Sequence, residues 1–300
     1  MIRIGVDFGG SKIEAAAIDA DGAFVSRVRA ANPGDYAAAI ETVRGLVDEA
    51  ERAAGVARRP VGIGMPGSIS PRSGRVRNSN SVWLNGTAFD KDVEAALGRP
   101  VRVENDANCF ALSEATDGAG EGASVVFGAI LGTGCGGAVV VSGRTVEGHN
   151  RIGGEWGHTP LPWPTVAERG AHRCWCGRTD CLERWISGSA FTADYAEATG
   201  RALLGEEIAR LARAGEAAAG AALERYVDRL GRALAVICDI LDPDVIVCGG
   251  GMSNVAEIYQ GVGPAIERHV FSDVFTTRVL PARHGDSSGV RGAAWLWPSP

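Results

Sequence analysis

Lysine is almost absent from this sequence of 300 residues. Only two of its 30 basic residues, Lys12 and Lys91, are lysines, and the others are arginines. Together with abundant alanine, this imbalance is typical of a codon bias, so most of the arginines carry little functional information, whereas Lys12 is conspicuous. The formal net charge is −6 and no run of five like charges occurs. Both features argue against a nucleic acid or an anionic membrane as a partner.

The sequence also lacks a long uninterrupted apolar run. Asp7 interrupts the apolar start, so we expect no signal peptide and a cytoplasmic location. Residues 122–143 are uncharged and numerous enough to span a bilayer, but glycines break their middle, which predicts two strands around a glycine turn. Seven cysteines, an odd number, favour free thiols or metal ligands over a disulfide framework.

The composition excludes disordered, collagen-like and small disulfide-rich proteins, because 45% of the residues are apolar and 22% are charged. A chain of this length corresponds to about two domains. Residues 2–18 and 126–141 both read as strand, glycine turn and strand, which indicates an internal duplication. We therefore expect an α/β fold of two related lobes, over residues 1–117 and 118–286, with a C-terminal helix at 287–300 that belongs to the first lobe.

A turn of chemically useful residues follows the first expected strand. It contains Asp7, Gly9, Gly10, Ser11 and Lys12. Backbone N–H groups, a small hydroxyl and a cation bind phosphate, and a carboxylate holds water on Mg²⁺. A plain β-turn with glycine at positive φ explains this motif alone equally well.

Two further glycine-rich turns follow expected strands. The residues of these turns are Gly132, Thr133, Gly134 and Gly136 in the second, and Gly249, Gly250 and Gly251 in the third. Each turn alone is weak evidence, but three turns at strand ends are harder to explain as coincidence. A nucleotide offers a β-phosphate, a γ-phosphate and a base–ribose face, one for each turn.

Asn105 and Asp106 stand where an expected strand meets an expected helix. Junctions of this kind are favoured ligand positions in α/β folds. Taken singly, an N-capping aspartate is the simpler interpretation. Phosphoryl transfer to a hydroxyl, however, needs a carboxylate that accepts the hydroxyl proton, and Asp106 fits that role.

One histidine and three cysteines have the spacing of a metal site. His158, Cys174, Cys176 and Cys181 supply one nitrogen and three sulfurs, the closed tetrahedral set of a structural zinc ion. The zinc would clamp a proline-rich loop at 158–181. A cluster of free thiols is the alternative interpretation.

Two glutamates, Glu155 and Glu183, flank this cluster. Their carboxylates are suited to accept hydrogen bonds from sugar hydroxyls, although a solvated surface is the default interpretation of any glutamate. The remaining cysteines lie in apolar patterns and are expected in the core. They are Cys109, Cys135, Cys238 and Cys248.

Together these motifs resemble the ROK family of sugar kinases and repressors. The motifs that carry the resemblance are Asp7-x-Gly9-Gly10-x-Lys12, Asn105-Asp106-Ala107-Asn108, Leu131-Gly132-Thr133-Gly134-x-Gly136, Glu155-x-Gly157-His158, the run from Cys174 to Glu183, and Gly249-Gly250-Gly251. They cover nearly the whole chain. Within the family, the likeness is greatest to bacterial fructokinases, also described as manno(fructo)kinases. That likeness rests on residues 64–71, 80–86, 155–163 and 284–297.

The resemblance implies an actin-like ATPase fold of two RNase H-like lobes around a cleft for ATP, Mg²⁺ and a sugar. It implies that Asp106 is the catalytic base and that His158 contacts both zinc and sugar. The residues implied as sugar contacts are Gly67, Asn80, Asn85, Asn105, Glu155, His158 and Glu183. A homodimer is implied as well.

We expect ATP-dependent phosphorylation of the 6-hydroxyl group of a hexose, with D-fructose as the leading substrate. A kinase of the same family for N-acetylglucosamine or another N-acetylhexosamine is the nearest alternative. A sugar-sensing protein without turnover is the alternative from a different class, and Asp106 argues against it, because a sensor needs no proton acceptor. No motif distinguishes a ketose from an aldose, since single contacts in a pocket decide that choice.

Overall fold

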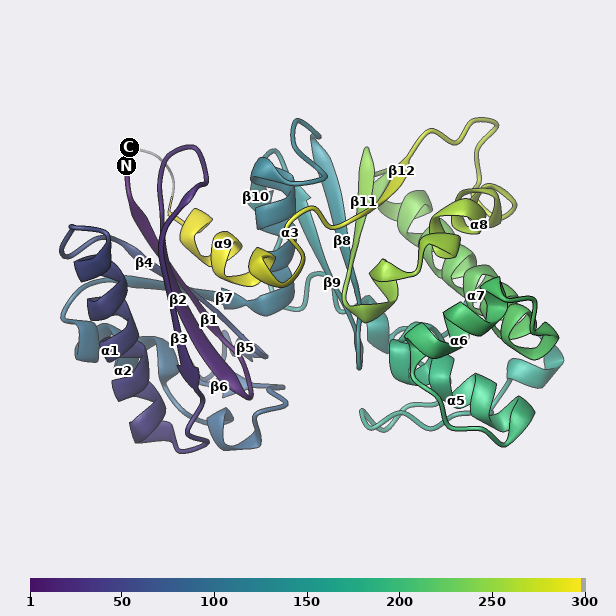
Figure 1. Cartoon of the computed structure of the whole chain (residues 1–300), viewed down its shortest axis with the longest axis horizontal. Coiled ribbons are helices and arrows are strands. Elements are labelled where there is room, and N and C mark those ends of the chain that lie inside the picture. The colour runs from purple at the N-terminus through teal and green to yellow at the C-terminus, as the bar shows by residue number, and fades with distance from the viewer. Residues whose placement is uncertain (298–300) are drawn as a thin grey trace. The chain divides into compact units, whose positions relative to one another are not determined.

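The computed structural model describes residues 1–297, in which the chain forms two compact units (Figure 1). Unit 1 contains Met1–Gly122, Gly143–Gly153 and the described residues from His284 onward. Unit 2 contains Ala123–Ser142 and Gly154–Arg283. This division differs from the expected lobes at 1–117 and 118–286 because Gly143–Gly153 packs with unit 1.

Unit 1 is built on a five-stranded sheet with the strand order β3-β2-β1-β4-β7. The strands are β1 (Arg3–Phe8), β2 (Lys12–Ile18), β3 (Phe24–Ala31), β4 (Val61–Met65) and β7 (Val101–Asn105). The first three are antiparallel neighbours, whereas β4 and β7 run parallel to β1. The carboxyl ends of β1, β4 and β7 therefore lie at one edge of the sheet, where α/β folds bind ligands.

Unit 1 also contains three short strands. They are β5 (Ser68–Ile69), β6 (Val76–Arg77) and β10 (Arg144–Thr145). β5 and β6 pair with each other and form a small hairpin after β4.

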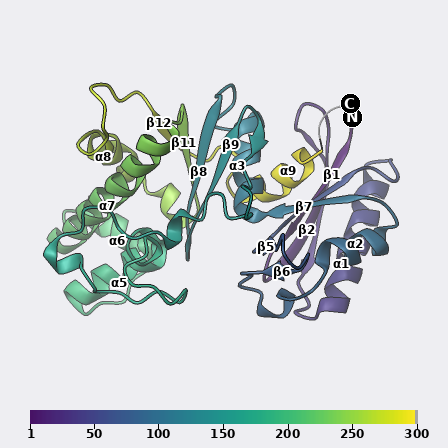
Figure 2. The ribbon, with the colours of Figure 1, turned by 180° about the vertical axis from the view of Figure 1, so that it is seen from behind.

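Two pairs of helices pack against the sheet of unit 1. They are α1 (Tyr36–Ala53) with α2 (Phe89–Leu97), side by side in Figure 2, and α3 (Asp106–Asp117) with α9 (Ser288–Trp295). Ile4 and Val6 of β1 belong to the core that α1 covers. Gly5, between them in the strand, points to the other face and meets α9. The helix expected at 287–300 is thus α9, and residues 298–300 lie outside the described residues.

Glycine allows α9 to approach its neighbours closely. A Cβ atom at Gly5 would lie 2.0 Å from the carbonyl oxygen of Val290, and one at Gly62 would lie 1.8 Å from that of Ala293. On the helix itself, a Cβ at Gly292 would lie 1.7 Å from the carbonyl oxygen of Cys109. Any side chain at these three positions would force the backbones apart.

Unit 2 repeats the sheet of unit 1. Its strands are β8 (Val125–Leu131), β9 (Cys135–Val141), β11 (Val245–Gly249) and β12 (Arg278–Pro281). Among the strands of unit 2 the order is β9-β8-β11-β12, with β9 antiparallel and the others parallel to β8. The order and directions match those of β2-β1-β4-β7, as expected from an internal duplication. The uncharged residues 122–143 form two strands around a glycine turn, as predicted.

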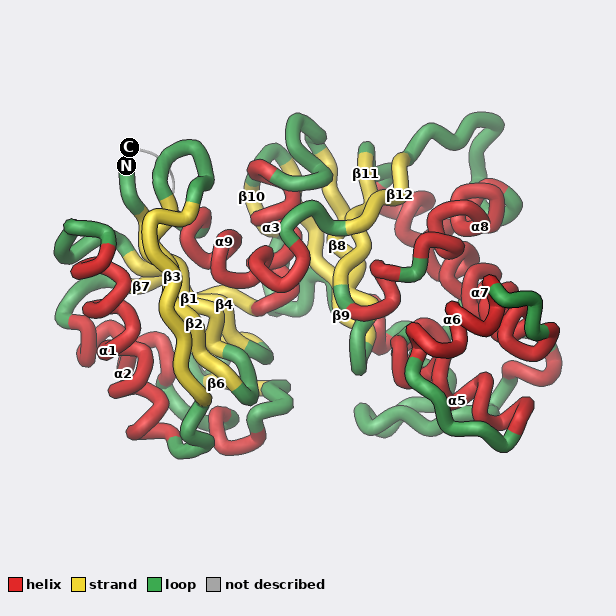
Figure 3. The backbone as a smooth tube through the Cα atoms, in the orientation of Figure 1, coloured by secondary structure: helices red, strands yellow, loops and turns green. Residues whose placement is uncertain are grey.

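Helices surround one side of this second sheet and form the larger core (Figure 3). They are α4 (Glu183–Ile186), α5 (Gly188–Thr199), α6 (Gly205–Arg213), α7 (Ala217–Leu241) and α8 (Ala256–Glu267). Among residues 1–297, no helix is both long enough and apolar enough to cross a membrane.

The proline-rich loop is fastened to α7 by a buried ion-pair network. The Glu168 carboxylate accepts hydrogen bonds from Arg229 Nε at 2.9 Å and from Arg232 Nη2 at 2.9 Å. Burial alone would raise the pKa of Glu168, but the hydrogen bonds from the two arginines lower it to about 2. Removing one partner of such a pair typically costs about 3–5 kcal/mol, because it leaves the other charge buried without compensation.

Candidate functional site

The first glycine turn forms the tip of the β1–β2 hairpin. Its backbone is closed by a 3.0 Å hydrogen bond from the N–H of Gly9 to the carbonyl of Lys12. Gly10 and Ser11 are exposed at the tip. Neither Gly9 nor Gly10 has a positive φ; a Cβ at Gly9 would lie 2.9 Å from the Lys12 carbonyl oxygen. Close approach of the backbone, rather than a left-handed conformation, therefore explains Gly9.

Asp7, the carboxylate before this turn, lies in a concentration of negative charge. Burial, together with the negative charges of Asp106 and Glu14, raises the pKa of Asp7 to about 6 against the opposing effect of the cations Lys12 and Arg27. Asp7 also lies beside α9, because a Cβ at Gly289 would be 3.2 Å from the Asp7 Cγ atom. An excess of carboxylates in a partly buried place fits a divalent cation.

Asn105 and Asp106 form the junction between β7 and α3. Asn105 is the N-cap of α3, since its Oδ1 accepts a 2.9 Å hydrogen bond from the N–H of Ala107. Its Nδ2 donates to the carbonyl of Gly67 at 3.0 Å. Asp106 is the first residue of the helix and is exposed. The N-cap interpretation of Asp106 is therefore wrong, because Asn105 occupies that position.

The sequence reasoning missed Glu104, immediately before this junction. Its Oε1 accepts hydrogen bonds from the N–H of Asn105 at 2.8 Å and from Nδ2 of Asn108 at 2.9 Å. The signal available in the sequence was a carboxylate near the end of a short strand, directly before Asn105-Asp106. That signal is weak, because such glutamates are usually solvated.

The loop after β4 contains three of the residues expected to contact sugar. Gly67 has a φ of +84°, and a Cβ there would lie 2.5 Å from the carbonyl oxygen of Arg77. Asn85 closes the loop through hydrogen bonds in both directions with the backbone of Ser79, each of 2.9 Å. Asn80 lies in the segment so closed and is exposed. Asn85 therefore stabilises the loop, whereas the side chain of Asn80 is accessible to a ligand.

In unit 2 the second and third glycine turns lie against each other. Gly250 has a φ of +80°, and a Cβ there would lie 2.6 Å from the carbonyl oxygen of Leu131. The carbonyl of Gly132 accepts a 2.7 Å hydrogen bond from the N–H of Gly188, the first residue of α5. Thr133 is exposed at the tip of the second turn. Strand ends and a helix N-terminus therefore converge here, an arrangement that binds anions.

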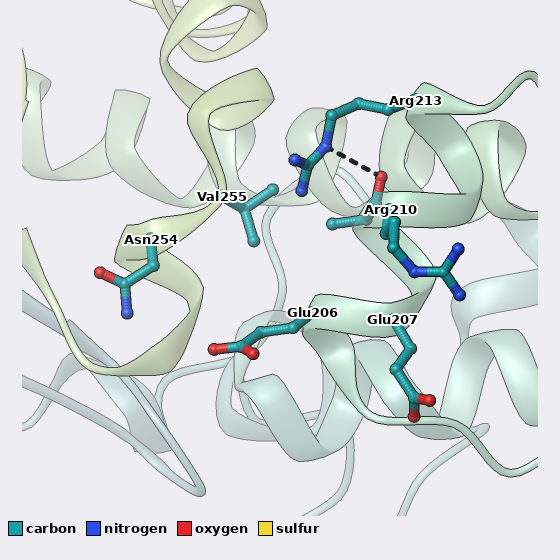
Figure 4. Close-up of a pocket in the computed structure, with 7 residues that line it drawn as sticks. Glu206, Glu207, Arg210, Arg213, Asn254 and Val255 are labelled. Carbon is teal, nitrogen blue, oxygen red and sulfur yellow. Dashed lines mark hydrogen bonds between the residues drawn. The ribbon is translucent and has the colours of Figure 1, made fainter.

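A pocket of 380 Å³ lies beside the third turn. Figure 4 shows it between the start of α6 and the end of the short 3-10 helix η4 (Gly251–Asn254). Its lining residues are Glu206, Glu207, Ala209, Arg210, Arg213, Asn254 and Val255. The lining combines the carboxylates of Glu206 and Glu207 and the guanidinium groups of Arg210 and Arg213 with apolar surface, which suits a ligand that has both polar and apolar parts, such as a nucleoside.

The four expected metal ligands come together. His158, Cys174, Cys176 and Cys181 place one ligand atom each within 4.8 Å of one another. His158 Nδ1 lies 3.7 Å from Cys174 Sγ, and the sulfurs of Cys176 and Cys181 are 3.5 Å apart. Zinc–sulfur bonds of about 2.3 Å in a tetrahedron place sulfurs roughly 3.8 Å apart, so the set fits a zinc ion.

The electrostatics of the cluster also suit a cation. A backbone N–H at Arg178 lowers the pKa of Cys176, which favours a thiolate. Burial and the neighbouring thiols raise the pKa of Cys181 to about 12, so this sulfur needs a nearby positive charge to ionise. A divalent metal supplies that charge. The other four cysteines are buried, as predicted for core residues.

Glu183 connects the metal-ligand cluster to the second glycine turn. One carboxylate oxygen accepts a 2.7 Å hydrogen bond from Nε1 of Trp175, which lies between two metal ligands. The other oxygen accepts a 3.2 Å bond from the N–H of Cys135 and lies 2.7 Å from a Cβ built on Gly134. The sequence singled out Glu183 but not Trp175, whose contact depends on the fold.

Glu155 and His158 lie at the two ends of one short helix: Glu155 is the N-cap of η2 (Trp156–His158), and His158 is its last residue. Trp156 anchors that helix, because its Nε1 donates a 2.7 Å hydrogen bond to the carbonyl of Gly136. Glu155 is exposed. A Cβ at Gly157 would lie 1.9 Å from the Cys135 carbonyl oxygen, so η2 packs directly on β9.

The expected site residues thus form one group in each unit. Unit 1 brings together the first glycine turn, Asp106, Asn105 and the loop after β4. Unit 2 brings together the other two glycine turns, Glu155, Glu183 and the metal-ligand cluster.

Comparisons with known proteins agree on the family of this chain. The model of the ROK family matches residues 3–299. N-acetyl-D-glucosamine kinase of Photobacterium profundum is 40% identical over 297 residues, which are 97% of this chain and 98% of that protein.

Solved structures agree with this match. A ROK hexokinase from Thermus thermophilus is 33% identical with a TM-score of 0.87, covering 98% of this chain and 97% of that one. A ROK family glucokinase from Streptomyces griseus, solved with glucose and AMPPNP, is 28% identical with a TM-score of 0.79, covering 99% of both chains. The expected actin-like ATPase fold of RNase H-like units is confirmed.

Proposed function

The chain belongs to the ROK family, and from that premise we propose that this sugar kinase transfers the γ-phosphate of ATP to the 6-hydroxyl group of N-acetyl-D-glucosamine. The observation that carries the choice of sugar is the 40% identity to an N-acetyl-D-glucosamine kinase over 97% of the chain. The sequence-based preference for fructose had less support, because it rested on short stretches of the chain.

D-fructose remains the second candidate substrate. The stretch from Glu155 to Trp163, Glu-Trp-Gly-His-x-Pro-Leu-Pro-Trp, favours it, because it resembles bacterial fructokinases. This stretch includes η2 and therefore bears directly on Glu155 and His158.

Asp106 is the proposed catalytic base. Its carboxylate accepts the proton of the sugar 6-hydroxyl group while the oxygen attacks the γ-phosphorus atom and ADP leaves with the bridging oxygen. Two observations support this role: Asp106 is exposed at the first position of α3, and Asn105, not Asp106, caps the helix. Asn105 is proposed to orient the junction and contact the sugar.

The nucleotide is assigned to the glycine turns. Asp7, Gly9, Gly10, Ser11 and Lys12 are proposed to bind phosphate, as are Gly132, Thr133, Gly134 and Gly136 of the second turn and Gly249, Gly250 and Gly251 of the third. The pocket beside the third turn supports a nucleoside position there. Mg²⁺, when bound, neutralises charge on the transferred phosphate, and the carboxylate excess around Asp7 fits such an ion.

The sugar is assigned to Gly67, Asn80, Asn85, Asn105, Glu155, His158 and Glu183. Structural zinc is assigned to His158, Cys174, Cys176 and Cys181, where the closed ligand set leaves no place for catalytic water. With Nδ1 of His158 turned to Cys174, its Nε2 is proposed to face the sugar. A homodimer is proposed on the family resemblance alone.

An ADP-release assay with ATP, Mg²⁺ and a panel of sugars tests the choice of substrate. We expect N-acetylglucosamine to have the highest kcat/KM, at least about tenfold above fructose, mannose and glucose, since one pocket contact supplies ~1–3 kcal/mol. A higher kcat/KM for fructose would favour the second candidate. No sugar-dependent ADP release with any member of the panel would exclude both and favour a sugar-sensing protein.

A further inference from the structure

A carboxyl group that the proposed steps do not use lies behind the Asn105–Asp106 junction. Glu104 Oε1 accepts from the N–H of Asn105 at 2.8 Å and from Nδ2 of Asn108 at 2.9 Å. Asn105 belongs to the end of β7, and Asn108 belongs to the first turn of α3. A single oxygen atom thus ties the strand end to the helix start, on either side of Asp106.

Glu147, on the segment after β10, lies near enough for its negative charge to help raise the pKa of Glu104. Arg151 Nε lies 3.3 Å from Glu147 Oε2. A protonated carboxyl group can donate a hydrogen bond to a neighbouring carboxylate, whereas two ionised carboxylates are both acceptors and repel each other.

We propose that Glu104 is a positioning residue of the kinase reaction: by accepting hydrogen bonds from Asn105 and Asn108, its carboxyl group holds Asn105 and Asp106 in place at the start of α3. The inference rests on the proposed function for the role of Asp106. The hydrogen bonds that Glu104 accepts do not depend on the reaction.

Electrostatic effects support this assignment. Burial raises the pKa of Glu104 to about 7, and the negative charge of Glu147 contributes to the shift. The thiol of Cys109 on α3 also faces this region, but burial raises its pKa well above the ordinary value, so it stays neutral. Arg102, two residues earlier on β7, packs over the ring of Trp297 at 4.3 Å and donates to the carbonyl of Leu296.

A pH dependence follows from the raised pKa. The folded protein binds the Glu104 proton more tightly than the unfolded chain, so the stability that this group contributes is greatest at low pH and is lost as pH rises through about 7. Above that pH the Glu104 carboxylate is ionised, the negative charge of Glu147 acts against it, and we expect the junction to loosen. Asp7, with its pKa raised to about 6, titrates in the same range, so only a difference between variants isolates Glu104.

Glu104→Gln is the variant that separates positioning from mere packing. Its amide oxygen still accepts from Asn105 and Asn108, and its NH₂ group donates to Glu147 at every pH. We expect kcat near that of the parent at about pH 6, and a Tm that falls less than the parent's between about pH 6 and pH 8. Glu49→Gln, at an exposed position on α1, is the matched control and should follow the parent.

Glu104→Ala removes the acceptor altogether. We expect kcat to fall about tenfold, with smaller changes in both KM values, since unmade polar hydrogen bonds cost roughly that factor or more. Parent-like kcat in Glu104→Ala, or identical Tm profiles for the parent and Glu104→Gln, would overturn the proposal. If the parent phosphorylates no sugar, the proposed function fails, but the Tm profiles still decide whether Glu104 gains its proton at the raised pKa in the folded protein.

Discussion

Replacing Asp106 with asparagine is expected to lower kcat by about 10²–10⁴-fold, the usual effect of losing a general base. The change is nearly isosteric and leaves Asn105 as the N-cap of α3. KM for ATP and for sugar should therefore stay close to the parent values. Steady-state kinetics with both substrates varied in turn gives all three constants.

Asp35→Asn is the matched control for this experiment. Asp35 also lies at a helix N-terminus, where its side chain accepts from the N–H of Ala38, and asparagine caps helices as well as aspartate does. We expect no change in kcat. If Asp106→Asn kept more than a tenth of the parent kcat, Asp106 would not be the base.

Replacing Cys176 with serine is expected to remove the metal and weaken the surrounding loop. Changes to groups that merely support a ligand reduce metal affinity about 10–100-fold, so loss of a ligand should exceed that range. Sugar KM should rise, because His158 belongs to the same ligand set and Glu155 to the same short helix. Metal content by elemental analysis, Tm and sugar KM measure the three effects.

Cys238→Ala serves as the control, because Cys238 is buried in α7 and is not one of the four ligands. It should keep its metal, although its cavity lowers stability somewhat. A parent preparation without zinc that has full activity and an unchanged sugar KM would contradict the metal assignment. Trp175 lies between two metal ligands and donates to Glu183, whose other oxygen accepts from the N–H of Cys135. Losing the metal should therefore also disturb the second glycine turn.

Local patterns predicted the parts of the fold that depend on local sequence. The alternation of Ile4, Val6 and Phe8 corresponds to β1, and all three side chains are buried. Apolar residues at helical spacing, such as Ile40, Val43 and Val47, likewise indicate α1, where all three are buried. The edge strand β3 was not predicted, because small and polar residues such as Ser26 and Ala30 share its half-buried face and arginines interrupt it. α8 was missed because Pro264 lies inside it, against the usual rule for helix interiors.

The candidate site likewise has one part that local sequence predicts and another that only the fold reveals. His158, Cys174, Cys176 and Cys181 lie close in sequence, so their spacing alone indicated a metal site. The bond from Cys135 to Glu183 joins residues 48 apart, and the pair of Glu104 and Glu147 comes from different elements. No periodicity reports such contacts, since they depend on how the elements pack. The sugar preference was likewise beyond reach of the motifs, which resembled fructokinases while the 40% identical relative is an N-acetyl-D-glucosamine kinase.

The central claim is that the chain phosphorylates a sugar with ATP. The most direct measurement is product analysis by phosphorus NMR after incubation with ATP, Mg²⁺ and N-acetylglucosamine. We expect N-acetylglucosamine 6-phosphate and ADP in equal amounts, and neither product when Asp106→Asn replaces the parent over the same time. ADP formed without any sugar phosphate, or no reaction with any hexose, would contradict it.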